Sequence, residues 1–273
     1  MTILLVYFSA TGNTARIAKV IAESLTAAGA TVESIDITAL AAHRQPIDLT
    51  AFEAMVLGMP IHSWRAPRVV REWLGTLNGQ GKRCAMFFSY GGFQVHPAHY
   101  STQQILTAQN FVVVSSAEFL GAHTFNIGGW HAMPGRPNQA DLDLAAEYAK
   151  LAYQRLTGDD PEILGAMEQT EHTAEHLDAI ESLRFKVLTA LPNRGGAACS
   201  MCSQCEEACP TGAMDAEAGE ADPAKCIACL GCVANCPEDA LRINDMAASW
   251  AFKLQMEQAT EESLKDKHSR VYF

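Results

Sequence analysis

A repeat of cysteines constrains the fold of this chain more than any other feature of its sequence. Eight of the nine cysteines form two sets with a period of 27 residues, and each set reads C-x2-C-x2-C-x3-C followed by proline. The segment that carries them is poor in large apolar residues, so it needs metal ligation to hold a stable structure. The two sets are Cys199, Cys202, Cys205 and Cys209, and Cys226, Cys229, Cys232 and Cys236.

Cysteines at this spacing suit the corners of an iron–sulfur cube. A tight loop can supply three corners, while the proline turns the fourth cysteine toward the neighbouring cluster. We therefore expect two [4Fe–4S] clusters. The first would use Cys199, Cys202, Cys205 and Cys236, and the second Cys226, Cys229, Cys232 and Cys209. The alternative is a pair of zinc sites, but zinc prefers two C-x2-C pairs separated by a longer spacer.

Over about 50 residues this segment resembles the bacterial-type two-cluster ferredoxins. The resemblance implies a small α+β domain over residues 196–245 whose clusters relay single electrons at low potential, at roughly −400 mV. The segment carries two basic and nine acidic side chains. Negative charge opposes the addition of an electron, so this composition also favours a low potential.

The first 157 residues alternate between strand-like and helix-like segments. Apolar strands are expected at residues 3–8, 31–37, 54–58, 83–89 and 111–119, and helices at residues 14–28, 67–77, 97–108 and 141–156. Continuous apolar strands separated by helices indicate a parallel sheet covered on both faces. The fold class is therefore α/β, a doubly wound five-stranded parallel sheet, with its ligand at the carboxyl ends of the strands.

A loop rich in hydroxyl groups follows the first strand. Its residues Ser9, Thr11, Gly12, Asn13 and Thr14 precede the first helix, and backbone amides at a helix N-terminus bind anions. The loop has no lysine and does not read G-x-G-x-x-G, which argues against a nucleotide triphosphate and a dinucleotide. Of these ligand classes, a phosphomonoester held by neutral hydrogen-bond donors remains. With this loop placed after the first strand, residues 1–157 resemble the flavodoxin family. The resemblance implies that these five residues bind the phosphate of FMN.

The same resemblance places the flavin ring between two further loops. Aromatic candidates for stacking on the ring are Trp64, Tyr90 and Phe93. Many flavodoxins have a glycine in the first of these loops, whereas His62 and Ser63 stand here, and a positive φ is disfavoured at such residues. The two loops comprise Pro60, Ile61, His62, Ser63 and Trp64, and Ser89, Tyr90, Gly91, Gly92 and Phe93.

The rest of the chain divides by composition. Residues 158–195 form an acidic, mostly helical connector, and residues 246–273 a C-terminal helix, expected at 247–267, with a short tail. The loop at residues 126–135 either lines a pocket over the flavin or covers an apolar edge. Cys84 lies in an apolar strand and is expected to be a buried hydrophobe. His172 and His176 lack a third ligand, so we do not assign them a metal.

Charge is distributed unevenly between the two halves. The net charge is −11, and most of it lies after residue 157. This excludes nucleic acid as a partner and favours redox proteins with a basic docking face. Arg65, Arg68 and Arg71 recur at intervals of three, on one face of the expected helix. This face either meets the acidic ferredoxin segment, of the same chain or of a second copy in a homodimer, or is solvated.

These features together resemble a flavodoxin–ferredoxin fusion protein, which implies electron transfer that couples one-electron and two-electron steps. One alternative is an FMN-dependent reductase of a small molecule such as a quinone, a nitro compound or a disulfide, with His62, His123 and His131 near the ring. A redox sensor is a second alternative. The sequence contains no apolar run long enough to span a membrane and no signal peptide, so we expect a cytoplasmic protein.

Overall fold

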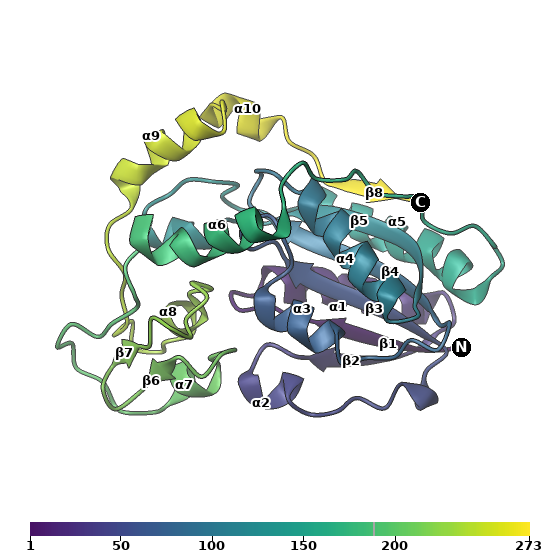
Figure 1. Cartoon of the computed structure of the whole chain (residues 1–273), viewed down its shortest axis with the longest axis horizontal. Coiled ribbons are helices and arrows are strands. Elements are labelled where there is room, and N and C mark those ends of the chain that lie inside the picture. The colour runs from purple at the N-terminus through teal and green to yellow at the C-terminus, as the bar shows by residue number, and fades with distance from the viewer. Residues whose placement is uncertain (188) are drawn as a thin grey trace.

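A six-stranded sheet forms the centre of the molecule in the computed structural model, which describes residues 1–187 and 189–273, without the side chains of His96 and residues 184–187 (Figure 1). The strand order is β2-β1-β3-β4-β5-β8. The first five strands are parallel, as expected, and β8 is antiparallel to β5. The strands are β1 (Thr2–Tyr7), β2 (Thr31–Asp36), β3 (Ala54–Pro60), β4 (Arg83–Tyr90), β5 (Val112–Leu120) and β8 (Arg270–Tyr272).

Helices cover both faces of this sheet because its central strands are apolar on both sides. On one face lie α1 (Asn13–Ala27) and α5 (Gln139–Thr157), which bury Ile17, Ile21 and Tyr148 against the strands. On the other lie α3 (Arg68–Leu74) and α4 (His96–Ala108), which bury Val70 and Leu106. Short turns, α2 (Leu40–His43), η1 (Leu49–Ala51) and η2 (Thr124–Gly128), occupy the connections.

The second half begins with α6 (Ala174–Val187) and continues into the cysteine-rich module. That module contains two short helices and a two-stranded sheet and packs beside the carboxyl ends of the main strands (Figure 1). Its elements are α7 (Gln204–Glu207), β6 (Met214–Asp215), β7 (Glu220–Ala221) and α8 (Gly231–Ala234). The few regular elements agree with the small α+β fold expected for a chain stapled by metal ligands.

The C-terminal segment differs from the single helix expected over residues 247–267. It forms α9 (Ala247–Met256) and α10 (Glu261–Lys265), separated by a break. The break has a local cause, because the Thr260 side chain accepts a hydrogen bond from the Ser263 amide and Ser263 bonds back to Thr260. This reciprocal capping starts a new helix at that point. None of the helices in the described part of the chain is long and apolar enough to cross a membrane.

The strand β8 was not expected from the sequence, and it is anchored by a buried polar network. His99 contacts Ser116 Oγ through Nδ1 at 2.7 Å and Glu118 Oε2 through Nε2 at 3.0 Å. The Tyr272 hydroxyl donates to the same Glu118 oxygen at 3.0 Å. His99, Ser116 and Glu118 are buried, so β8 completes the hydrogen bonding of groups that water does not reach.

We predict that Tyr272→Phe lowers the Tm of the anaerobic holoprotein by about 2–4 °C, because it removes a hydrogen bond worth about 1 kcal/mol. The measurement is thermal unfolding followed by far-ultraviolet circular dichroism. Tyr153→Phe on α5 removes a hydroxyl outside this network and is the matched control. Equal shifts in the two variants would contradict the role given to the network.

Candidate functional site

The loop between β1 and α1 has the geometry of an anion cradle. Gly12 precedes α1 with a φ of 91° and has no side chain that could cap the helix. The Ser9 hydroxyl accepts a hydrogen bond from the Ala15 amide at 3.0 Å, and the Thr14 hydroxyl is 2.8 Å from that of Ser89. A Cβ placed at Gly12 would meet open space. The start of α1 beside Gly12 therefore faces room for a ligand, which fits a phosphate group.

A cavity of about 50 Å³ opens beside this loop, at the carboxyl ends of β1, β3, β4 and β5. Its walls also include four residues that follow β5, of which His123 was expected near the ring and the other three, Gly121, Ala122 and Thr124, were not expected from the sequence. The Asn13 side chain ties the first loop to this one by donating to Ala122 O at 2.8 Å. Ten of the predicted residues line it: Ser9, Thr11, Asn13, Thr14, Pro60, Ile61, His62, Ser89, Tyr90 and Gly91.

A second, larger cavity of about 300 Å³ adjoins the first. Ile61, Tyr90, Gly91 and His123 line both cavities, so the two lie side by side. Ser63, Trp64 and Phe93 line it as well, which brings all three aromatic candidates to one space. Gly92, with a φ of 85°, turns the chain between these residues, and a Cβ there would touch Met133. The far walls come from α6 and α9.

The loop after β3 departs from the expectation that positive φ values are avoided there. Ser63 and Trp64 have φ values of 47° and 68°. They form the centre of a tight turn, closed by bonds from the His62 amide to Arg65 O at 2.8 Å and from the Arg65 amide to His62 O at 3.1 Å. Left-handed backbone costs roughly 1–2 kcal/mol per non-glycine residue. Trp64 offsets part of this cost by stacking on His172 of the connector, at 4.9 Å between ring centroids.

Two arginines join this loop to the acidic connector. Arg65 Nη2 lies 2.5 Å from Asp178 and 3.1 Å from Glu181, and Arg71 Nη2 lies 2.9 Å from Glu181. The bond from Arg65 lowers the pKa of Asp178. Arg65, Arg71 and Glu181 are largely shielded from water, so these ion pairs are stronger than ordinary surface pairs.

The prediction of a basic face on one helix is therefore only partly correct. Arg65 precedes α3, which begins at Arg68. Arg68 is exposed and pairs with Glu72 at 3.8 Å. The acidic partner of Arg65 and Arg71 is α6 rather than the cysteine-rich module, because the connector passes directly over this loop.

The cysteines form two groups, each mixing the two repeats. Cys199, Cys202, Cys205 and Cys236 line one small cavity of about 20 Å³. The Ala240 amide donates to Cys236 Sγ at 3.3 Å, and the Met201 amide to Cys199 Sγ at 3.4 Å. Such bonds favour the thiolate form that binds iron. The fourth cysteine of the second repeat thus faces the first three of the first repeat, the crossover that the spacing predicts.

The other four cysteines are also neighbours. Burial raises the pKa of the Cys232 thiol, and the nearby Cys229, Cys226 and Cys209 raise it further. The Ala213 amide donates to Cys209 Sγ at 3.2 Å. Among residues 1–187 and 189–273, no three His, Cys, Asp or Glu side chains are placed to hold a single metal ion.

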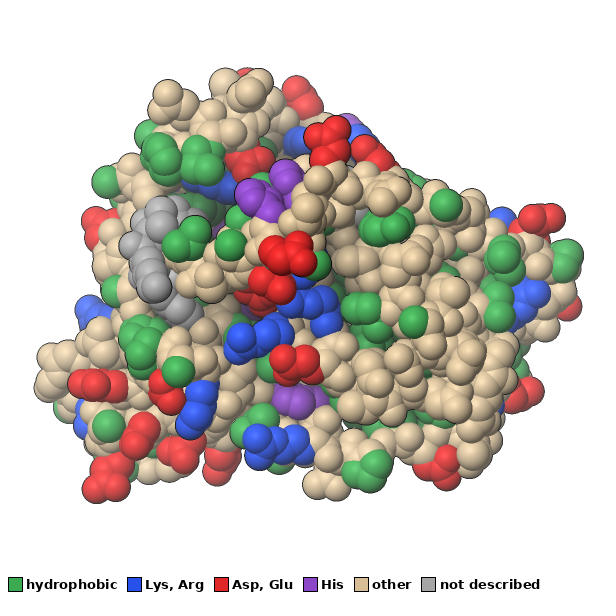
Figure 2. All heavy atoms as spheres, in the orientation of Figure 1, with side chains coloured by type: hydrophobic (Ala, Val, Ile, Leu, Met, Phe, Trp, Pro, Cys, Tyr) green, Lys and Arg blue, Asp and Glu red, His purple; other side chains and the backbone are tan. Residues whose placement is uncertain are grey.

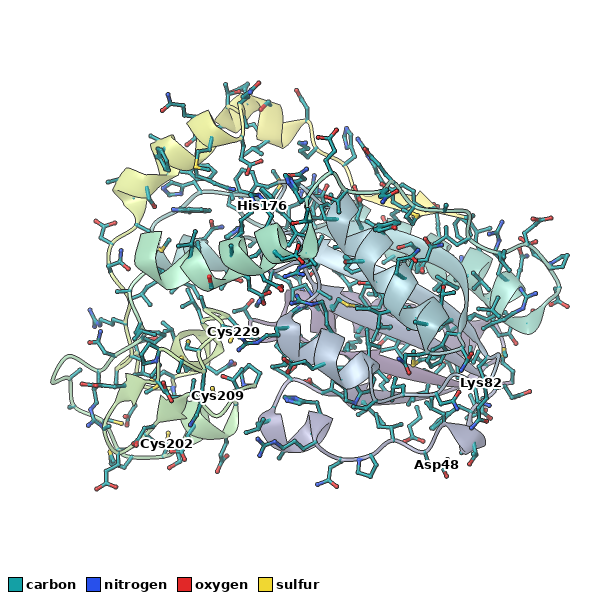
Figure 3. All side chains as sticks on the ribbon, viewed as in Figure 1. Asp48, Lys82, His176, Cys202, Cys209 and Cys229 are labelled. Carbon is teal, nitrogen blue, oxygen red and sulfur yellow. The ribbon has the colours of Figure 1, made fainter. Side chains whose placement is uncertain are left out.

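The second cysteine group lies directly against the cavity at the sheet. Cys229 lines that cavity together with the loop after β1. Asn235 Nδ2 donates to Ala10 O at 3.0 Å, and a Cβ at Gly231 would lie 3.2 Å from the same oxygen. In Figure 3, Cys202, Cys209 and Cys229 lie progressively closer to the main sheet. In space, the group with Cys229 therefore lies between the other cysteine group and the cavity.

The remaining candidates have structural roles. Cys84 is buried, and burial raises the pKa of its thiol. His172 and His176 stack on each other at 4.9 Å beside Trp64. The loop at residues 126–135 covers an apolar cluster, where Trp130 Nε1 donates to Ser249 Oγ at 2.8 Å, and Trp130 also lines the larger cavity. Both expectations for that loop are thus partly met.

Family comparisons agree with this geometry. A family model for a flavodoxin domain matches residues 4–111, and one for a 4Fe-4S dicluster domain matches residues 191–237. The chain is a flavodoxin–ferredoxin fusion. It is therefore an electron-transfer protein with one domain of the kind that binds FMN and another of the kind that binds [4Fe–4S] clusters.

The flavodoxin domain is similar to several solved structures. A flavodoxin from the domain Archaea has 19% identity and a TM-score of 0.44, over 57% of this chain and 99% of that one. Flavodoxin 1 from Bacillus cereus has 18% identity and a TM-score of 0.42, over 55% and 95%. Flavodoxin from Megasphaera elsdenii has 24% identity and a TM-score of 0.41, over 55% and 98%. None of the curated proteins matches the chain.

We predict that Glu181→Gln lowers the free energy of local unfolding of α6 by about 2 kcal/mol. The substitution leaves two shielded guanidinium groups with one carboxylate partner. Amide hydrogen exchange in α6 should then accelerate by about thirtyfold. Glu171→Gln neutralises an exposed carboxylate of the same connector and is the control. Unchanged exchange in Glu181→Gln would show that the ion pairs do not hold α6 in place.

Proposed function

We propose that this chain relays low-potential electrons through two [4Fe–4S] clusters to FMN within one molecule, and so couples one-electron and two-electron steps. One observation carries the proposal. Cys229, a proposed ligand of the second cluster, lines the same cavity as the loop that would hold the FMN phosphate. The inner cluster and the flavin are then neighbours without any movement of the domains.

The proposed ligands follow from the two cysteine groups. Cys199, Cys202, Cys205 and Cys236 would hold the outer cluster, and Cys226, Cys229, Cys232 and Cys209 the inner one. The mixing of the repeats supports this assignment, because each group takes three cysteines from one repeat and the fourth from the other. The amides of residues 201, 213 and 240 would stabilise the thiolates by hydrogen bonding to sulfur.

The flavin site would be built from the loops after β1, β3, β4 and β5. Ser9, Thr11, Gly12, Asn13 and Thr14 would bind the phosphate, and the loops at residues 60–64 and 89–93 would hold the ring. FMN supplies an acceptor that takes one electron or two, and the protein sets its potential and position. Arg65 and Arg71 are neutralised by α6, so they place little net charge beside the ring.

The outer cluster is the proposed entrance for electrons. Cys202 is exposed, and Figure 2 shows acidic side chains gathered over the dicluster domain. Glu206, Glu207, Glu217 and Glu238 belong to this domain. A negative surface draws partners with a basic face and speeds their encounter. We place the protein in the cytoplasm, since thiolate ligands persist in a reducing compartment.

A second candidate function is supported by the larger cavity. Trp64, Tyr90 and Phe93 of the proposed ring site form one side of it, and apolar and aromatic side chains dominate its walls. Pockets of this kind bind small molecules. A reductase that passes electrons from FMN to a small acceptor therefore deserves a test beside the relay to a protein partner.

The proposal predicts a cofactor count. Protein purified without oxygen should contain about eight iron atoms, about eight sulfides and about one FMN per chain. Elemental analysis, sulfide assay and flavin absorbance measure these values. Zinc in place of iron, or a chain that binds no FMN, would overturn the proposal.

We also predict that Gly231→Val slows reduction of FMN by the clusters by about tenfold or more, because added atoms near Ala10 O would push α8 away from the loop after β1. The measurement is rapid-mixing absorbance of the anaerobic protein after reduction of its clusters. Gly165→Val adds the same atoms in open space and is the control. Equal rates in the two variants, with full cofactor content, would contradict the direct path.

A further inference from the structure

We propose that the larger cavity binds a flat, electron-poor cyclic dicarbonyl compound of the quinone class. The inference rests on the proposed function, because the reduced flavin would supply the electrons. It selects one of the three small-molecule acceptor classes, and it identifies the residues that would hold that acceptor.

The shape of the cavity favours a small planar ligand. Four residues join it to the proposed phosphate site, so a flavin ring would enter from that side. On the opposite side the walls are made by α6 and α9, which lie outside the matched flavodoxin segment. Ile180 and Leu183 come from α6, and Phe252 and Met256 from α9. The cavity therefore includes a region that these two helices help to enclose.

The far side carries large apolar side chains that water still reaches. Leu183 is 46% exposed, Phe252 51% and Met256 63%. Exposed apolar side chains gathered at one place mark sites of interaction. Here they surround the mouth of a concave space beside Trp130 and Phe93, where an aromatic guest would stack and remove them from water.

One ion pair supplies the polar recognition. Lys253 and Glu257 are the charged residues among the described side chains that line this cavity, and both are largely shielded from water. The Lys253 ammonium also lies 4.6 Å from the centre of the Phe93 ring. A cation held against an aromatic wall can donate to a carbonyl oxygen of a stacked guest and stabilise negative charge developing there.

The charge balance disfavours the other acceptor classes. Charged disulfides would bring several ionic groups into a space whose own charges are one cation and one anion. A nitro compound carries its polar atoms at one end, where they would accept from Lys253. A ring with polar atoms at two opposite ends suits a cavity with apolar walls between them. The remaining class, a quinone, takes up two electrons and two protons at its two carbonyl oxygens and leaves as the hydroquinone. The electrons come from the reduced protein and the protons from water.

The test uses the anaerobic holoprotein and menadione as the probe. Menadione binding to the oxidised protein is measured by quenching of tryptophan fluorescence, and its reduction by steady-state kinetics with dithionite-reduced clusters. We expect saturable binding, and a rise of about tenfold in both Kd and KM for Phe252→Ala, with a smaller rise for Met256→Ala. Leu151→Ala removes an equally exposed apolar side chain on α5 and should change neither.

Lys253 is tested by a conservative pair of variants. Lys253→Gln should raise the Kd for menadione about tenfold, and Lys253→Arg should restore most of the affinity because it keeps the cation. FMN content is measured in every variant. Loss of FMN from Phe252→Ala would show that this wall belongs to the flavin site and would overturn the inference, as would menadione binding that fails to saturate or is equal in Phe252→Ala and Leu151→Ala.

The two proposals fail in different ways. If the clusters do not reduce FMN in the unmodified protein, the proposed relay is wrong, and menadione binding to the oxidised protein still decides the present inference. If FMN is reduced but menadione does not bind, the relay stands and the cavity does not bind a quinone.

Discussion

The close approach of α8 to the loop after β1 is the contact on which the rest of the arrangement depends. Gly231 permits it, because any side chain there would crowd the Ala10 carbonyl. Asn235 then satisfies that carbonyl with its amide at 3.0 Å. Around this contact, Ile227 and Cys229 pack into the core of the flavodoxin domain, and Leu230 packs into the cluster that contains Tyr90. Burial and hydrogen bonding together fix the cysteine-rich module beside the cavity.

The segments outside the two domains complete the site. The connector places α6 over the loop after β3 through Arg65 and Arg71, and the C-terminal segment places α9 along the far wall. The strand β8 then adds to the edge of the sheet, where Tyr272 bonds to Glu118. An edge strand with unpaired backbone groups can associate with other chains. By pairing with β5, the strand β8 covers part of that edge of the sheet.

Strong local patterns in the sequence predicted the two domains and most of the loops that meet at the cavity. The cysteine spacing gave the crossover between the repeats, and the apolar strands gave the parallel sheet. Features that depend on distant residues could not be predicted. The strand β8 has three residues and is too short for a periodic pattern, and the ion pairs of Arg65 depend on a helix more than a hundred residues away. The left-handed turn at Ser63 and Trp64 is stabilised in part by stacking on the distant His172, which local propensity does not describe.

The crossover between the cysteine repeats links damage at one end of the molecule to events at the other. Cys236 faces the cysteines of the exposed group, yet it directly follows Asn235, which holds α8 against the flavodoxin domain. In the proposed arrangement, an oxidant that removed the outer cluster would free Cys236, the neighbour of the residue that anchors α8. Loss of that cluster would in this way loosen the contact between the dicluster domain and the flavodoxin domain.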